Sequence, residues 1–271
     1  MHAIILSAGR GSRLLPLTTD IPKCLLPIGV STVLSLQLDT LFKCGVKSAT
    51  VVTGFNDHLV KAEINSRELG PKVKTLYNPF YQVADNLASC WMARRSMKSD
   101  FLIINGDTLF SPRVLETVLN APAKDITITI DQKDYYDGDD MKVALAGTQL
   151  TAIGKTLAAR ETHGESIGML RFMNDGPKIF RDELKRLMRL EAGITNWYLS
   201  AIHGLAEQGV HIDTTNIKGA TWAELDTPED YEFCRDLFGN SEMARKRFTA
   251  IKASSKSKRQ MQLYCSSLRG F

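Results

Sequence analysis

A glycine-containing loop after the first apolar run constrains the fold of this chain more than any other stretch. The run from Ala3 to Leu6 predicts a buried strand, and Gly9 and Gly11 follow it directly. A backbone without Cβ atoms can turn tightly and bring its N–H groups against a ligand. Successive N–H groups in such a turn form a concave site for anions. We therefore expect an anion-binding turn at the carboxyl end of a first strand.

Three cations accompany this loop, because Arg10, Arg13 and Lys23 fall within a span of fourteen residues. This combination suits a polyphosphate better than other common ligands. Two familiar phosphate loops do not fit. Leu14 stands where a dinucleotide-binding loop needs its third glycine, and the Gly-Lys-Ser/Thr of a Walker loop is absent.

Strand and helix patterns alternate along the first half of the chain. The predicted strands after the first are 49–53, 73–77, 101–105 and 126–130, and the predicted helices are 32–44, a short one capped by Asp57, 86–95 and one that starts at Ser111-Pro112. Alternation at this rate predicts an α/β fold with a mostly parallel central sheet and helices on both faces. Ligands bind at the carboxyl ends of such strands, where the opening loop and residues 105–107 both fall.

The rhythm changes from Met141 onward. A hairpin around Gly147-Thr148 and a third strand, 166–172, predict a small antiparallel subregion, followed by helices over 177–190, 198–208 and 228–238. We expect residues 1–240 to form one domain with an acceptor-binding insertion at about 131–215, and 241–271 to form a basic tail. From Met243 onward eight basic residues and no acidic ones occur, which leaves 26 basic and 30 acidic residues in the first 242.

Two aspartates stand where a hard cation would be bound. Asp107 leaves an apolar strand behind Gly106, which predicts a carboxylate in a cleft. Asp226 precedes Thr227-Pro228, and it could instead cap the following helix, although Thr227 is the better capping residue.

Cysteine usage and the N-terminus bear on the compartment. The five cysteines are scattered and odd in number, which argues against a disulfide framework or a zinc site and favours a reducing compartment. Met1-His2 leads straight into the first strand, and no apolar run is long enough to span a bilayer. We expect a cytoplasmic protein without a signal peptide or membrane span.

The stretch from Gly9 to Lys23 resembles the Gly-x-Gly-x-Arg-Leu-x-Pro-Leu-Thr-x-x-x-Pro-Lys pattern of nucleoside-triphosphate transferases that act on sugar phosphates and related phosphorylated alcohols. The resemblance implies a Rossmann-like nucleotidyltransferase fold. In that family a Gly-Asp at the end of the central strand and an Asp before Thr-Pro-Glu-Asp hold Mg²⁺, which here implies Asp107 and Asp226 as metal ligands. It also implies that Arg13 and the loop amides bind the β- and γ-phosphates, and that Lys23 faces the α-phosphate. The implied catalytic residues are therefore Arg13, Lys23, Asp107 and Asp226.

Further segments resemble the branch of phosphocholine and 2-aminoethylphosphonate cytidylyltransferases. These segments are 78–81 (Asn-Pro-Phe-Tyr), 85–91, 139–143, 154–155 and 165–169, and the whole resemblance extends from Met1 to about Phe238. It implies a nucleotide-binding set of Ala8, Gly9, Gly11, Ser12, Arg13, Lys23, Asp85, Asn86, Ser89 and Asp107. It implies an acceptor-binding set of Asp139, Asp140, Lys142, Lys155, Glu165, Gly168, Trp197 and Tyr198.

The expected reaction follows from these parts. A phosphate or phosphonate dianion attacks the α-phosphorus of CTP, pyrophosphate leaves in line, and no catalytic base is needed because the nucleophile's last pKa is about 6. The lysines suit the anionic end of the acceptor, and the carboxylates with Tyr135, Tyr136 and Trp197 suit an ammonium group.

Other functions remain open from the sequence. A sugar-1-phosphate uridylyl- or thymidylyltransferase is the main alternative, and a non-catalytic nucleotide sensor is another. The basic tail could bind nucleic acid, but it carries no RNA-binding motif, so we expect no nucleic-acid partner. The expected partners are CTP and a small phosphorylated or phosphonate acceptor, with a homodimer possible.

Overall fold

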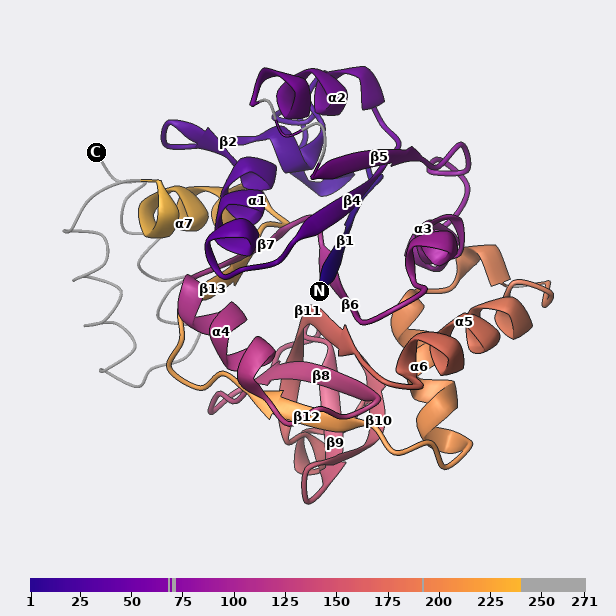
Figure 1. Cartoon of the computed structure of the whole chain (residues 1–271). Coiled ribbons are helices and arrows are strands. Elements are labelled where there is room, and N and C mark those ends of the chain that lie inside the picture. Colours follow the sequence, from indigo (N-terminus) through magenta and orange to yellow (C-terminus); the bar gives the residue numbers. More distant parts are fainter. Residues whose placement is uncertain (68, 70–71, 192, 240–271) are drawn as a thin grey trace.

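The computed structural model describes residues 1–67, 69, 72–191 and 193–239, and the predicted basic tail lies outside these residues. A nine-stranded sheet runs through the described part in the order β5-β4-β1-β6-β11-β8-β12-β10-β9 (Figure 1). Helices pack on both of its faces. The α/β fold expected from the sequence is confirmed.

The N-terminal part of the sheet is parallel, as predicted. Its strands are β1 (His2–Ser7), β4 (Ser48–Thr53), β5 (Val73–Tyr77) and β6 (Phe101–Asn105). β1 pairs with β4 on one side and with β6 on the other. The carboxyl ends of β1 and β6 are therefore neighbours, and the loops that leave them share one edge of the sheet.

The predicted antiparallel subregion continues the same sheet, so the complete sheet is mixed. The strands of this second part are β8 (Ile126–Asp131), β9 (Lys142–Ala146), β10 (Gln149–Gly154), β11 (Gly164–Phe172) and β12 (Asp213–Asn216). The sequence placed 126–130 at the end of the parallel series, but β8 pairs antiparallel with β11 and parallel with β12. β11 joins the two parts because it pairs antiparallel with β6 and with β8. Its N-terminal end also pairs with β9, which places Glu165 opposite Lys142.

Two apolar cores cover the two faces of the sheet, and β1 contributes side chains to both. Ile4 lies in the core beneath α3 (Asn86–Ala93), α5 (Gly176–Leu187) and α6 (Tyr198–Glu207). Ala3 and Ile5 point to the opposite core, beneath α1 (Val33–Lys43), α2 (Asp57–Ser66) and α4 (Pro112–Asn120). Alternate residues of a strand face opposite sides, so an unbroken apolar run is what a strand buried on both faces requires.

A short second sheet determines where Asp226 lies. β7 (Thr108–Phe110) and β13 (Trp222–Glu224) pair antiparallel, and the backbone N–H of Leu225 donates to the Asp107 carbonyl at 3.1 Å. A third, two-stranded sheet joins β2 (Pro27–Ile28) and β3 (Ser31–Thr32). The β7–β13 pairing brings a segment from the end of the domain against the end of β6.

The sequence predicted the N-terminal cap of α7 correctly and that of α2 incorrectly. α7 (Pro228–Phe238) begins with a capping box, in which Thr227 and Asp230 each bond the other's backbone N–H, as the choice of Thr227 over Asp226 predicted. The predicted cap of α2 is wrong, because Asn56 is its N-cap residue and Asp57 is its first helical residue. The Asp57 carboxylate accepts instead from Thr53 and pairs with Lys61. Among the described helices, none is long and apolar enough to cross a membrane.

Candidate active site

The opening loop folds back on itself where β1 ends. Gly11 has φ of 73°, and a Cβ atom there would lie 3.0 Å from the Lys23 Cβ, so both conformation and space favour glycine. The Gly11 carbonyl accepts from the Leu14 N–H at 3.0 Å and from the Thr18 hydroxyl at 2.8 Å. Leu14 is fully buried, whereas Gly9, Ser12 and Arg13 are exposed. The buried Leu14 side chain anchors the loop, and the polar groups of Ser12 and Arg13 remain on the surface.

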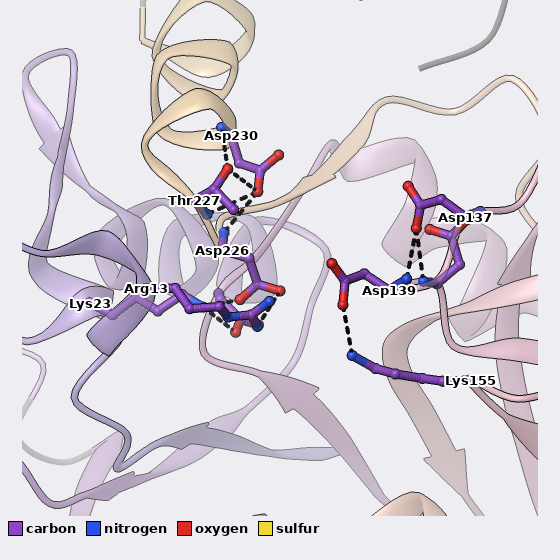
Figure 2. Close-up of polar contacts among 10 residues, drawn as sticks. Arg13, Lys23, Asp137, Asp139, Lys155, Asp226, Thr227 and Asp230 are labelled. Carbon is purple, nitrogen blue, oxygen red and sulfur yellow. Dashed lines mark hydrogen bonds and ion pairs between the residues drawn. The ribbon is translucent and has the colours of Figure 1, made fainter. Parts of the chain in front are cut away.

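Lys23 joins the two predicted metal-binding aspartates. Its Nζ lies 2.7 Å from Asp107 Oδ2 and 2.6 Å from Asp226 Oδ1. Arg13 Nη2 lies 3.0 Å from the other oxygen, Asp226 Oδ2 (Figure 2). All four predicted catalytic residues therefore meet at one place, although they are up to 213 positions apart in the chain.

Electrostatics hold this cluster in its charged form. Burial alone would lower the pKa of Lys23, but the charges and hydrogen bonds of Asp107 and Asp226 outweigh burial and raise that pKa. Burial would raise the pKa of Asp226, but Lys23 and Arg13 lower it overall. The cations and carboxylates stabilise each other's charged states.

The donor set at this place fits Mg²⁺. The second carboxylate oxygen of Asp107, Oδ1, is buried and has no hydrogen-bond partner. Asp107 and Asp226 both reach one cation, and Mg²⁺ prefers one or two carboxylates, with substrate phosphates and water completing its ligands. No group of three or more His, Cys, Asp or Glu side chains converges as a metal site in the described part of the chain. A site with two carboxylates would depend on the bound nucleotide for its remaining ligands.

Glu224 is a third carboxylate beside this cluster that sequence reasoning did not assign. It ends β13, two residues before Asp226. Burial, with the charges of Asp107 and Asp226, raises its pKa to about 8. The residue stood inside the 222–230 segment used for the resemblance, but only the β7–β13 pairing shows that it lies beside Asp107.

The predicted nucleotide-binding helix is bonded to a predicted acceptor segment. Asp85 is the N-cap residue of α3, and its carboxylate accepts from the Asn86 N–H at 2.8 Å and from the Trp197 indole N–H at 2.7 Å. Asn86 Oδ1 accepts from the Tyr198 N–H at 2.8 Å. Ser89 is buried, and its hydroxyl accepts from the Asn78 amide at 3.1 Å. The contacts of Asp85 and Asn86 therefore join the predicted nucleotide-binding residues to the predicted acceptor-binding residues Trp197 and Tyr198.

Two predicted acceptor residues, Asp139 and Lys155, face each other across from the lysine–aspartate cluster. Lys155 Nζ lies 3.4 Å from Asp139 Oδ1 (Figure 2). The same Nζ lies 5.1 Å from the centre of the Trp197 ring. Lys155 also lowers the pKa of Asp226, which places its charge near the predicted metal site. The Lys142 ammonium donates to the Lys155 carbonyl at 2.8 Å, so the ends of β9 and β10 are joined there.

The remaining predicted acceptor residues lie in the loop before β9, on β11 and at the start of α6. Asp140 and Glu165 are nearly buried, with 5% and 6% of their surfaces exposed. Both pair with Lys133, a residue that sequence reasoning did not single out. Gly168 has φ of 69°, and a Cβ there would lie 2.3 Å from the Asn105 side chain, so close packing explains this glycine. Tyr198 is buried and its hydroxyl bonds Asn105 Oδ1 at 3.2 Å.

Comparisons with known proteins agree with this geometry. The Nucleotidyl transferase family matches residues 2–139, just over half of the chain. The chain is 32% identical over 238 residues to the CMP-5'-(3-aminopropyl)phosphonate synthase of Streptomyces rubellomurinus, covering 85% of this chain and 37% of that protein. It is 24% identical to the CTP:phosphoglutamine cytidylyltransferase of Campylobacter jejuni, covering 86% of this chain and 98% of the other. The chain spans about a third to a half of the length of three of the curated relatives that it matches, the phosphonate synthase among them.

The fold also matches solved structures. The structure of the inositol-1-phosphate CTP transferase from T. maritima superimposes with a TM-score of 0.73 at 19% sequence identity, covering 92% of this chain and 95% of the other. The fold of this chain, its glycine loop and the family match all agree. The chain belongs to the nucleotidyl transferase family.

Proposed function

We propose that this protein is a Mg²⁺-dependent cytidylyltransferase. It transfers CMP from CTP to a small phosphorylated or phosphonylated amino alcohol, and it releases pyrophosphate. The observation that carries the proposal is the convergence of Lys23, Asp107 and Asp226 beside a glycine loop at the carboxyl ends of β1 and β6. A cation, two carboxylates and an anion-binding turn are the parts that a transfer at phosphorus requires.

The residues act by positioning and by neutralising charge. Backbone N–H groups at Gly9, which is exposed, and at Gly11, which is half-buried, bind the outgoing phosphates of the triphosphate together with the Arg13 guanidinium. Lys23 faces the α-phosphate, where negative charge increases in the transition state. An acceptor phosphate or phosphonate is already a dianion at neutral pH, so no side chain has to remove a proton.

Mg²⁺ would be held by Asp107 and Asp226, and when bound it would neutralise negative charge on the α-phosphate and the acceptor. Lys23 now bridges these carboxylates, so the lysine has to leave at least one of them to reach a phosphate.

The charges of the acceptor region and the names of two relatives support CTP as the nucleotide and an amine-bearing phosphate or phosphonate as the acceptor. Lys142 and Lys155 supply positive charge for a phosphate or phosphonate, and Asp139, Asp140 and Glu165 supply negative charge for an amine. A neutral sugar ring has no charge with which to replace Lys133 or Lys155 at these carboxylates. Two relatives that extend over most of this chain have names that specify CMP or CTP, and their named products or substrates carry an amino group and a phosphonate or phosphate.

Pyrophosphate release tests the proposal directly. The purified protein is incubated with each of the four ribonucleoside triphosphates or dTTP, Mg²⁺ and one acceptor from a panel. The panel contains phosphocholine, 2-aminoethylphosphonate, 3-aminopropylphosphonate and glucose-1-phosphate. We expect the highest kcat/KM with CTP and an amine-bearing acceptor. Faster turnover of glucose-1-phosphate with UTP or dTTP would overturn the assignment in favour of a sugar nucleotidyltransferase.

A further inference from the structure

Lys133 occupies a site that has the chemistry of an ammonium receptor. Its Nζ lies 2.8 Å from Asp140 Oδ2 and 2.7 Å from Glu165 Oε2. The same ammonium lies 5.6 Å from the centre of the Tyr136 ring. Two carboxylates and an aromatic face are the groups that recognise alkylammonium ligands in proteins.

Glu165 is held by the sheet, whereas Lys133 and Asp140 belong to the same connecting loop. Glu165 is on β11, paired with Lys142 of β9, and the Asp140 carboxylate also accepts from the Asp137 N–H at 2.7 Å. Their side chains are 7% and 3% exposed, and that of Lys133 is 24% exposed. Lys133 belongs to the connection between β8 and β9, outside both strands. Glu165 is therefore held by the sheet and Asp140 by a loop turn, and the Lys133 side chain is the most exposed of the three.

A cavity beside this site offers room for the lysine to move. It has a volume of about 400 Å³ and is bounded by residues 132–136 on one side and by Ala159, Thr162 and His163 on the other. Both Lys133 and Tyr136 line it. Open space therefore borders the Lys133 side chain.

The single ammonium does not neutralise both carboxylates. Burial and the neighbouring Asp140 carboxylate together raise the pKa of Glu165 to about 8, although the Lys133 ammonium opposes them. Asp131 and Asp140 also add to the negative charge around Tyr136. A ligand ammonium that takes the place of Lys133 keeps the same positive charge beside these two carboxylates.

We propose that Asp140, Glu165 and the ring of Tyr136 bind the ammonium group of the acceptor, and that Lys133 fills this site until the acceptor arrives. This assignment rests on the proposed function, because it names the part of the site that selects an amine. Lys142 links the two ends of the acceptor site, since it lies opposite Glu165 in the sheet and donates to the Lys155 carbonyl. β9 lies between β11 and β10, so these two strands are two strand spacings, or about 10 Å, apart. This separation suits a short acceptor with opposite charges at its ends.

The test compares two acceptors that differ only in the amine, 2-aminoethylphosphonate and ethylphosphonate. The amine preference is the ratio of their kcat/KM values with CTP. Glu165→Gln and Asp140→Asn should each lower this preference about 10- to 100-fold, as expected for loss of a charge-assisted hydrogen bond. Asp134→Asn is the matched control, because this exposed carboxylate of the same loop should leave the preference unchanged.

Lys133→Met distinguishes a placeholder from a structural lysine. If Lys133 competes with the acceptor, its removal should lower KM for 2-aminoethylphosphonate severalfold and leave KM for ethylphosphonate unchanged. A lower amine preference in Lys133→Met, or a preference within twofold of the parent in Glu165→Gln, would overturn the inference. An unchanged KM for CTP shows that each variant is folded.

Failure of the proposed function would look different. In that case the parent protein would form no product from CTP with any amine acceptor. Calorimetric titration of the parent and Glu165→Gln with 2-aminoethylphosphonate would then decide the inference alone. Binding that Glu165→Gln weakens supports the ammonium site, and equal binding to both proteins, or none to the parent, refutes it.

Discussion

Replacing Lys23 by methionine removes one ammonium group from the centre of the site while keeping a linear side chain of similar length. The parent ammonium contacts both Asp107 and Asp226, and its side chain is only 14% exposed. We expect two separable effects, one on catalysis and one on metal binding.

The effect on catalysis should be mainly on kcat. Negative charge increases on the α-phosphate only in the transition state, and an interaction that strengthens there accelerates the reaction. Loss of one such donor typically costs about 10²- to 10³-fold in rate. Arg10→Met is the control, because the Arg10 guanidinium lies 5.1 Å from the Phe55 ring centre and should affect kcat much less. A change confined to KM in Lys23→Met would show that Lys23 binds only the ground-state triphosphate.

The effect on metal binding should have the opposite sign. In the parent, the Lys23 ammonium competes with a divalent cation for the same two carboxylates. Two unit charges 4 Å apart repel by about 1 kcal/mol even in bulk water, so a divalent ion gains at least about 2 kcal/mol, or roughly 30-fold in affinity, when the ammonium is removed. Titration of nucleotide-free protein with Mn²⁺, followed by electron paramagnetic resonance, measures this directly. Unchanged or weaker Mn²⁺ binding in Lys23→Met would refute the competition.

Four further outcomes are expected. Asp107→Asn and Asp226→Asn should each abolish turnover and leave the circular dichroism spectrum unchanged; activity within a few-fold of the parent would remove that residue from the metal site. Thr227→Ala should lower the free energy of unfolding by about 1 kcal/mol, because the capping box of α7 is lost, and an unchanged urea midpoint would contradict this. Glu165 has a pKa of about 8 in the folded protein and an ordinary value of 4.5, so its stabilising contribution is complete below pH 4.5 and is lost as the pH rises through 8. Glu165→Gln should therefore gain stability relative to the parent between pH 5 and pH 9, by an amount on the order of 1 kcal/mol or more, and a difference that does not depend on pH would show that Glu165 is ionised throughout. Deletion of 243–271 should preserve kcat, because every residue of the proposed site precedes Gly239; a folded but inactive truncated protein would show that the tail contributes to the site.

Local sequence signals were sufficient for the longer strands and helices and for the first half of the site, but not for the short strands β2, β3 and β7. The apolar run of β1, the glycines after it and the cap at Thr227 each depend on neighbours within a few residues, so their patterns can be read directly. The family resemblance extended this to Asp107 and Asp226, and the structure brings both to Lys23. Their roles in metal binding and catalysis remain predictions.

The partners of those residues could not be read from the sequence, because they depend on contacts between distant segments. The pairing of β7 with β13 brings Glu224 beside Asp107, and nothing in the local pattern around Glu224 indicates this. The cap of α2 was misassigned for a related reason. Thr53 and Lys61 engage the Asp57 carboxylate, while Asn56 takes the left-handed conformation before the helix.

The acceptor region shows the same division most clearly. The sequence by itself determined that carboxylates, aromatic residues and lysines occur between 131 and 215, because composition and motif spacing are local properties. Only the tertiary structure decided which cation meets which carboxylate: Lys155 lies against Asp139, and Lys133 lies between Asp140 and Glu165. Burial and distance control the strength of an ion pair, and both are set by how β9, β10 and β11 pack rather than by the order of residues along the chain.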